Sequence, residues 1–315
     1  MILDRAFLEG RRITLGTIDP APDSPQPSPM PDTAHRAPKP LRAAIVYDFD
    51  GTLARGNLQE HSFIPELGID HDVFWKDVRR LAKTSDADEI LVYMQQMIER
   101  SRALGRAVTR DQLRAHGATP SFFDGVESWF PRMDSFAADQ GLELDHYVVS
   151  SGTEEMIEGC SIYPHFKRVF ASRFIYNDRG EAVWPAVAVN YTNKTQFLFR
   201  INKGIDNVWD TQAINRWMRA EERPLPFERM IFIGDGDTDI PSMKMVTDQG
   251  GTAIAVLDPD RWNDPLKVSH IHMLIAEDRV NYVAPADYLP ASQLDVIVKG
   301  ALQRIALRAG LPIAS

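Results

Sequence analysis

The chain has 315 residues, of which 44% are hydrophobic and 25% are charged, as is usual for a protein with a packed core. Its formal net charge of -9 disfavours a nucleic-acid-binding surface, which usually carries a basic patch. It does not exclude a phosphorylated small molecule, because a metal ion and a few local cations can dominate a small site. Cys160 is the only cysteine, so no disulfide forms within the chain, which favours a reducing compartment.

The N-terminal part of the sequence predicts no membrane or export signal. No apolar run approaches the length of a membrane span. Residues 1–18 lack the continuous apolar stretch of a secretory signal, so we expect a cytoplasmic protein with no membrane partner. Between Pro20 and Pro40, eight of the 21 residues are proline. We therefore expect residues 1–40 to be a disordered, Pro-rich leader.

A hydrophobic strand is expected at residues 43–47, and a long helical segment follows it. Apolar residues at helical spacing predict helices over 71–84, 87–104 and 111–116 and a further helix that ends near residue 140. That last helix contains Pro131, which we place in its first turn, where proline is tolerated. This segment of predicted helices is longer than a simple crossover connection between two strands of one sheet. We interpret residues 57–133 as an inserted helical cap and residues 41–56 with 134–315 as the core.

The second half of the chain alternates between strand and helix patterns. Strands are expected at 146–149, 169–174, 182–191, 230–233, 252–257 and 271–275, with a turn over 177–180. Helices are expected at 154–159, 195–204 and 292–308. This alternation predicts an α/β fold, with a Rossmann-like parallel sheet flanked by helices and an inserted α-helical cap.

Two acidic segments follow predicted strands directly. Residues 48–52 read Asp-Phe-Asp-Gly-Thr, and residues 234–239 read Gly-Asp-Gly-Asp-Thr-Asp. In open α/β sheets, ligands bind beyond the carboxyl ends of the strands. Carboxylates brought together there need a cation. The two segments therefore predict one Mg²⁺ site built from distant parts of the chain.

Neither acidic segment fits a calcium-binding loop. In an EF-hand that starts at Asp48, the glycine position holds Leu53 and the bidentate glutamate position holds Gln59. In one that starts at Asp235, the same positions hold Ile240 and Val246. This pattern disfavours a Ca²⁺-binding module.

Polar and basic residues at two further strand and helix ends match phosphate chemistry. Ser150, Ser151 and Gly152 follow the strand at 146–149, and Lys194 opens a helix. Together with the two acidic segments, they occur in the order and context of four motifs of the haloacid dehalogenase-like superfamily, which this sequence resembles. The helical insertion makes it similar to the phosphoserine-phosphatase-like subclass, although Asn57 stands where that enzyme has an acidic residue that contacts the substrate amine.

The resemblance implies catalytic and phosphate-binding roles for these residues. Asp48 would be the nucleophile and Asp50 the general acid and base. Lys194 would neutralise the charge that phosphate shares with Asp48. The phosphate-binding residues would be Thr52, Ser150, Ser151, Gly152 and Lys194, with Ser150 favoured over Ser151 and Lys194 over Lys203.

The resemblance also implies the metal ligands. Mg²⁺ would be held by Asp48, by Asp235 and by Asp50 through its backbone carbonyl alone. Asp239 and Asp237 would not bind the metal directly but would lie next to the residues that do. Asp239 would orient Lys194 or a metal-bound water.

We therefore expect a Mg²⁺-dependent phosphatase that hydrolyses a small phosphorylated metabolite through an aspartyl-phosphate on Asp48. Two alternatives remain open at this point: a phosphotransferase that uses the same intermediate, and a non-catalytic binding protein that keeps the fold. Arg55, Asn57, Glu60 and His61 are candidates for contacting the leaving group. The sequence makes no prediction of the substrate's identity or of oligomeric state.

Overall fold

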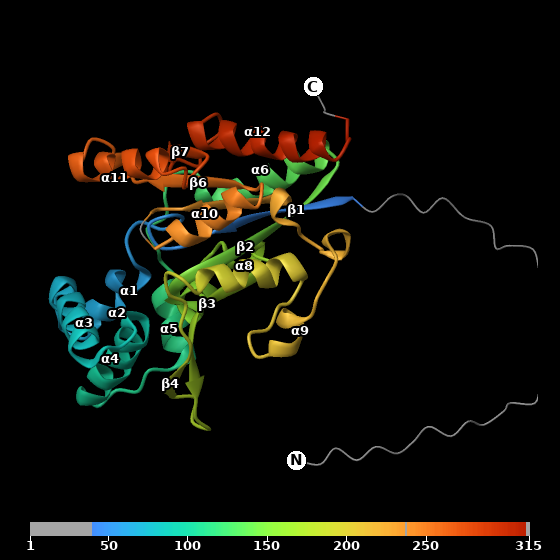
Figure 1. Cartoon of the computed structure of the whole chain (residues 1–315). Coiled ribbons are helices and arrows are strands. Elements are labelled where there is room, and N and C mark those ends of the chain that lie inside the picture. Colours follow the sequence, from blue (N-terminus) through green and yellow to red (C-terminus); the bar gives the residue numbers. More distant parts are fainter. Residues whose placement is uncertain (1–39, 237, 313–315) are drawn as a thin grey trace, which may run out of the picture. The chain divides into compact units, whose positions relative to one another are not determined.

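The computed structural model describes residues 40–236 and 238–312. The predicted leader at 1–40 lies outside these residues except for Pro40. A seven-stranded sheet organises the described chain, in the order β4-β3-β2-β1-β5-β6-β7 (Figure 1). All neighbouring strands are parallel except β3 and β4, which are antiparallel and enclose the predicted turn at 177–180. The strands are β1 (Leu41–Tyr47), β2 (Leu142–Thr153), β3 (Arg168–Tyr176), β4 (Ala182–Val187), β5 (Met230–Gly234), β6 (Thr252–Leu257) and β7 (Tyr282–Pro285).

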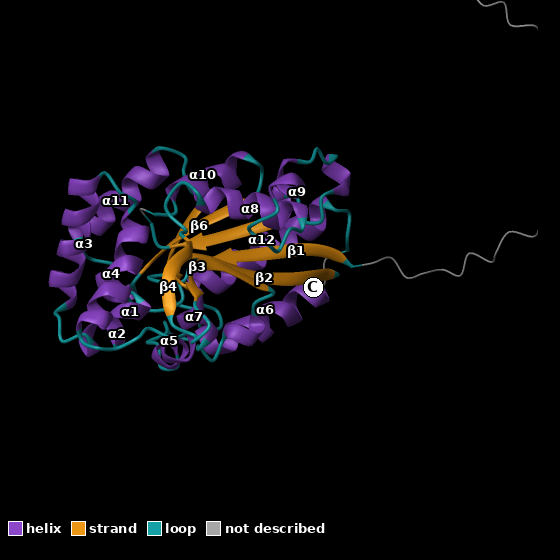
Figure 2. Ribbon diagram, turned by 90° about the horizontal axis from the view of Figure 1, so that it is seen from below, coloured by secondary structure: helices purple, strands orange, loops and turns teal. Residues whose placement is uncertain are grey.

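Helices cover both faces of this sheet, as Figure 2 shows. Side chains of β1 alternate between the two faces, so Ile45 packs in one hydrophobic cluster and Val46 in the other. The Ile45 face is covered by α6 (Val126–Asp139), α7 (Glu154–Glu158) and α12 (Gln293–Arg308). The Val46 face is covered by α8 (Lys194–Lys203) and α10 (Ile240–Asp248), with a contribution from α11 (Pro265–Ala276). The predicted Rossmann-like fold is confirmed.

Five helices between β1 and β2 gather beside the sheet instead of covering a face (Figures 1 and 2). The longest two begin at capping aspartates: Asp70 accepts hydrogen bonds from the first turn of α3, and Asp88 does so for α4. The domain boundaries stay a prediction; the boundary at 133/134 falls inside α6, which packs against β2 and α12. The five helices are α1 (Leu58–His61), α2 (Phe63–Glu66), α3 (His71–Ser85), α4 (Glu89–Ala103) and α5 (Arg110–Gly117).

The predicted strand at 271–275 is wrong, because these residues lie in α11. The helix begins with Pro265 after Asp264, whose side chain accepts a hydrogen bond from the backbone of Leu266. A short apolar run does not distinguish strand from helix by its periodicity. The strand that completes this edge of the sheet is β7, which the sequence pattern did not reveal.

The predicted position of Pro131 is also wrong. α6 begins at Val126, after Gly125 with φ of 85°, so Pro131 lies in its second turn. There its missing N–H leaves the carbonyl of Glu127 without its usual helical donor. The helix is retained because its apolar face, with Trp129 and Phe130, is fully buried.

No helix in the described part of the chain is long and apolar enough to cross a membrane.

The remaining α-helix, α9 (Thr211–Asn215), lies in the connection between α8 and β5.

Candidate active site

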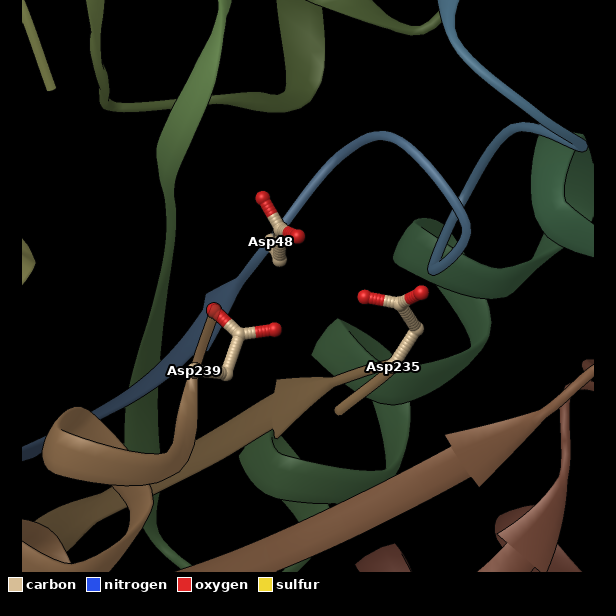
Figure 3. A group of neighbouring side chains, drawn as sticks. All are labelled: Asp48, Asp235 and Asp239. Carbon is tan, nitrogen blue, oxygen red and sulfur yellow. The ribbon is translucent and has the colours of Figure 1, made fainter. Parts of the chain in front are cut away.

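Three carboxylates converge at the carboxyl ends of the central strands β1 and β5 (Figure 3). Asp48 follows β1, Asp235 follows β5, and Asp239 immediately precedes α10. One ligand oxygen from each side chain lies within 4.8 Å of the others. The backbone N–H of Asp48 donates to the carbonyl of Ile233 at 2.9 Å, which extends the pairing of the two strands to the site itself. The two predicted acidic segments therefore meet.

Lys194 joins two of these carboxylates. Its Nζ lies 3.0 Å from Asp48 Oδ1 and 2.7 Å from Asp239 Oδ1, and its side chain is fully buried. Burial alone would lower the pKa of Lys194, but Asp239 and Asp48 outweigh it and hold the pKa above its ordinary value. Lys203, the alternative from the sequence, instead donates to the backbone carbonyls of Ile214 and Arg216. Lys194 is the lysine of the site.

The three carboxylates fit a bound divalent cation. Asp239 Oδ2 is buried and has no hydrogen-bond partner among the described residues. Burial and the charge of Asp48 raise the pKa of Asp235 above its usual range, because carboxylates buried close together repel one another. Carboxylate oxygens are the ligands that Mg²⁺ prefers in proteins. Asp237, the remaining predicted acidic residue, lies outside the described residues.

The side chain of Asp50 has a different environment. It is not part of the three-carboxylate group, and its Oδ1 accepts a hydrogen bond from the backbone N–H of Leu58 at 3.1 Å. Burial and the neighbouring Asp48 raise the pKa of Asp50 to about 8. A carboxyl group in this environment can hold a proton near neutral pH, as a general acid must.

The predicted phosphate-binding residues lie around Asp50 and Asp48, and some of their hydroxyls have no hydrogen-bond partner among the described residues. Ser150 Oγ accepts a hydrogen bond from the backbone N–H of Gly152 at 3.0 Å. The hydroxyls of Thr52 and Ser151 are buried and have no hydrogen-bond partner in the described chain. Ser151 and Gly152 line a cavity together with Asp50. The Ser151 hydroxyl is therefore available to a ligand in this cavity.

Gly152 leaves no room for a side chain beside Asp50. A Cβ at this position would lie 2.7 Å from Asp50 Oδ2 and 3.3 Å from Ser150 Oγ. We expect Gly152→Ala to displace Asp50 and to lower kcat by about tenfold or more, since small misplacements of reacting groups cost that much. Gly300→Ala is the matched control, because a Cβ there meets nothing within 4 Å. Equal kcat values for the two variants in steady-state phosphate release would contradict this geometry.

Two cavities open beside Asp50 and Asn57. The larger, of about 330 Å³, we call the leaving-group cavity; its wall includes Asp50, Gln59, Glu60, Trp75, Glu89 and Tyr93. The smaller, of about 160 Å³, lies on the side of Asp235 and is lined also by Asp258, Arg261 and Lys267. Of the residues that the sequence offered for the leaving group, Asn57 and Glu60 line the larger cavity. Arg55 instead pairs with Asp258, and His61 bonds the carbonyl of Arg55.

Sequence reasoning missed Trp75, Tyr93 and Gln59. The Tyr93 hydroxyl donates to the carbonyl of Ser151 at 2.7 Å, which connects α4 to the end of β2. Trp75 and Tyr93 lie on different helices, and their rings are 5.6 Å apart. Only the packing of α3 against α4 brings them together, so no local sequence signal marks them.

The sequence matches a known protein family over the residues that form this site. A family model described as haloacid dehalogenase-like hydrolase matches residues 45–244, which include both acidic segments, Ser150 and Lys194. An uncharacterized protein of Borreliella burgdorferi is 27% identical over 275 residues, covering 80% of this chain and 93% of that protein.

Solved structures share the fold at low sequence identity. A probable phosphoserine phosphatase from Vibrio cholerae is 11% identical, with a TM-score of 0.51, over 87% of this chain and 68% of that one. A HAD family hydrolase from Salmonella enterica serovar Typhi is 15% identical, with a TM-score of 0.50, over 83% of this chain and 72% of that one. Because the family model covers well over half of the sequence, the chain belongs to the haloacid dehalogenase-like hydrolases.

Proposed function

We propose that the protein is a Mg²⁺-dependent phosphatase that hydrolyses small phosphorylated metabolites through an aspartyl-phosphate on Asp48. The observation that carries this proposal is the Asp48 carboxylate, which pairs with the buried Lys194 and lies beside Asp235 and Asp239. The solved structure described as a probable phosphoserine phosphatase, which has a similar fold, supports phosphate monoesters as the substrate class. A leaving-group cavity of about 330 Å³ suits a small molecule.

In the first step, a carboxylate oxygen of Asp48 attacks the phosphorus of the ester in line with the leaving oxygen. The bond from phosphorus to that oxygen breaks, and Asp50 donates its proton to the departing alkoxide. Lys194 and the hydroxyls of Thr52 and Ser150 hold the phosphoryl oxygens while charge spreads over them.

In the second step, water attacks the phosphorus of the aspartyl-phosphate. Asp50, now deprotonated, takes a proton from this water, and the bond between phosphorus and the Asp48 oxygen breaks. Inorganic phosphate leaves, and Asp48 and protonated Asp50 are restored. Asp50 can serve both steps because its side chain is separate from the three-carboxylate group.

Mg²⁺ would be held by Asp48, Asp235 and the backbone carbonyl of Asp50. When bound, it supplies positive charge that offsets the repulsion between Asp48 and the phosphate. Asp239, whose Oδ1 accepts from Lys194, would orient that lysine and use its unpaired Oδ2 toward a metal-bound water.

Binding of Mg²⁺ should stabilise the folded protein. At a hundredfold excess over Kd, binding to the folded state alone contributes about 2.7 kcal/mol, so Mg²⁺ should raise Tm by several degrees and EDTA should reverse the effect. Asp235→Asn should lose most of this shift, since it removes a ligand charge. Asp178→Asn, in an exposed turn, is the control that should keep it. An undiminished shift in Asp235→Asn, measured by differential scanning fluorimetry, would show that the metal is bound elsewhere.

Hydrolysis itself is tested with p-nitrophenyl phosphate and a broad panel of phosphorylated metabolites. We expect phosphate release that needs Mg²⁺ and stops with EDTA. Addition of acceptor alcohols separates the phosphotransferase alternative, because transfer would convert the alcohol into a phosphate ester at the expense of inorganic phosphate. Complete inactivity on the panel, with Mg²⁺ bound, would favour a non-catalytic binding protein instead.

A further inference from the structure

Glu60 is an unusual carboxylate in the wall of the leaving-group cavity. Its Oε1 accepts hydrogen bonds from Asn57 Nδ2 and from Trp75 Nε1, both at 2.6 Å. Both donors are neutral, and no lysine, arginine or histidine of residues 40–236 and 238–312 forms an ion pair with Glu60. A half-buried carboxylate that is fixed in place but not neutralised favours a cation from a ligand.

Gln59 adds an unused acceptor to the same wall. Its side chain is 2% exposed, and its Oε1 has no hydrogen-bond partner among the described residues. A buried amide oxygen left without a donor costs free energy, so a ligand that brings an N–H or O–H group is favoured. This observation is independent of the charge on Glu60. It favours a ligand group with several hydrogen-bond donors in the cavity.

Two aromatic rings complete this part of the wall. Trp75 and Tyr93 lie 5.6 Å apart with their planes at 64°. The faces of such rings attract cations, and the attraction grows as water is excluded. A carboxylate, an amide acceptor and two aromatic rings together match a protonated primary amine, which offers both positive charge and three N–H donors.

The remaining charges of the cavity disfavour a carboxylate on the ligand. Glu60 and Glu89 line it, against the single guanidinium of Arg79, and Asp50 adds no charge while it holds the proton for the leaving group. Arg79 is exposed, and it also lines an adjoining cavity with Lys83, Asp86, Asp88 and Glu89. The balance inside the leaving-group cavity is therefore negative.

We propose that the leaving group of the substrate is a short amino alcohol that carries a protonated amine and no carboxylate, with Glu60 as the residue that selects it. This inference rests on the proposed phosphatase function and narrows its substrate class. The substrate is then a phosphate monoester whose amine binds Glu60 and Gln59 beside Trp75 while its phosphate lies at Asp48.

The test compares three esters with the full-length protein and Mg²⁺. O-Phosphoethanolamine carries the amine, n-propyl phosphate replaces the ammonium with a methyl group, and O-phosphoserine adds a carboxylate. We expect kcat/KM for O-phosphoethanolamine to exceed that for n-propyl phosphate by about tenfold to a hundredfold, as for a hydrogen bond to a charged group. We also expect it to exceed that for O-phosphoserine. Equal values for the first two esters, or a preference for O-phosphoserine, would overturn the inference.

Glu60→Gln tests whether Glu60 carries the selection. It keeps the shape of the side chain and removes the charge, so the ratio of kcat/KM for O-phosphoethanolamine over n-propyl phosphate should fall close to one. Glu99→Gln makes the same charge change on an exposed position of α4 and should keep the wild-type ratio. An unchanged ratio in Glu60→Gln would show that another group reads the amine.

A measurement on the wild-type protein covers the case in which Glu60→Gln does not fold. 3-Aminopropylphosphonate and n-butylphosphonate cannot be hydrolysed, so they compete with p-nitrophenyl phosphate for the site. A methylene replaces the ester oxygen, so the amine is as many atoms from phosphorus as in O-phosphoethanolamine. The amine should bind about tenfold tighter; equal inhibition would overturn the inference. Turnover of p-nitrophenyl phosphate with no amine preference rejects this inference alone, whereas no turnover of any monoester rejects the proposed function and the inference with it.

Discussion

Asp48→Asn should abolish phosphatase turnover, with kcat lowered by more than about 10⁴-fold. An asparagine amide cannot form the aspartyl-phosphate, and the substitution removes one of the three carboxylates grouped within 4.8 Å. It also leaves Lys194 with only Asp239 as an anionic partner. The rate of phosphate release at saturating substrate and Mg²⁺ is the measurement.

This loss should come without unfolding. In the absence of metal, Asp48 adds repulsion to Asp235 and Asp239, and asparagine keeps its size, so circular dichroism and Tm should show a folded protein. Asp248→Asn, an exposed aspartate of α10, is the matched control and should keep full activity. A folded Asp48→Asn protein with near-normal kcat would be incompatible with Asp48 as the nucleophile.

Asp50→Asn should slow turnover by about 10² to 10⁴-fold, the usual contribution of a general acid or base. The two steps should respond differently to the leaving group. p-Nitrophenolate leaves without a proton, so Asp48 should still be phosphorylated by p-nitrophenyl phosphate, whereas attack by water lacks its base. Stopped-flow absorbance should then show a burst of p-nitrophenolate, one per active site, followed by slow release.

Esters with poor leaving groups provide the contrast for Asp50→Asn. With an alkyl phosphate, the first step also needs the proton, so no burst of alcohol is expected. If both kinds of ester showed the same slow release without a burst, Asp50 would act on the first step alone or through the fold.

The parts of the site that lie at strand ends were predictable from the sequence. Hydrophobic strands followed at once by Asp48 and Asp235 place both residues at one edge of a parallel sheet, and the pairing of β1 with β5 confirms this. The role of Lys194 was implied by the family resemblance, in which a lysine opens a helix, and the structure places Lys194 at the first position of α8. In each of these cases the chemistry is tied to an element boundary that local composition reveals.

The leaving-group cavity was not predictable in the same way. The sequence offered four candidates for contacting the leaving group after the first acidic segment, and nothing in it separated Glu60 from Arg55. In the structure, Arg55 pairs with Asp258. Trp75 lies within the helix predicted over 71–84 and was not among the candidate site residues. Its role depends on the hydrogen bond to Glu60, which in turn depends on how α3 packs across α1 and α4.

The errors in the predicted fold also arise because the deciding signals lie outside the segment concerned. Residues 271–275 form an apolar run, and such a run fits a strand or a helix equally well over so short a length. The Asp264 cap and Pro265 were the signals for a helix, and they lie outside the run. Tertiary pairing with β6 selects β7 as the edge strand.

The location of the phosphoryl group in the trapped enzyme tests most directly whether Asp48 is the nucleophile. Asp50→Asn should be mixed with p-nitrophenyl phosphate and Mg²⁺, quenched in acid within the burst, digested, and analysed by mass spectrometry. We expect one added phosphoryl group on the peptide that contains Asp48, and none on that peptide when Asp48 is also changed to asparagine. A phosphoryl group on Ser150 or Ser151, or a burst with no labelled peptide, would contradict this role of Asp48.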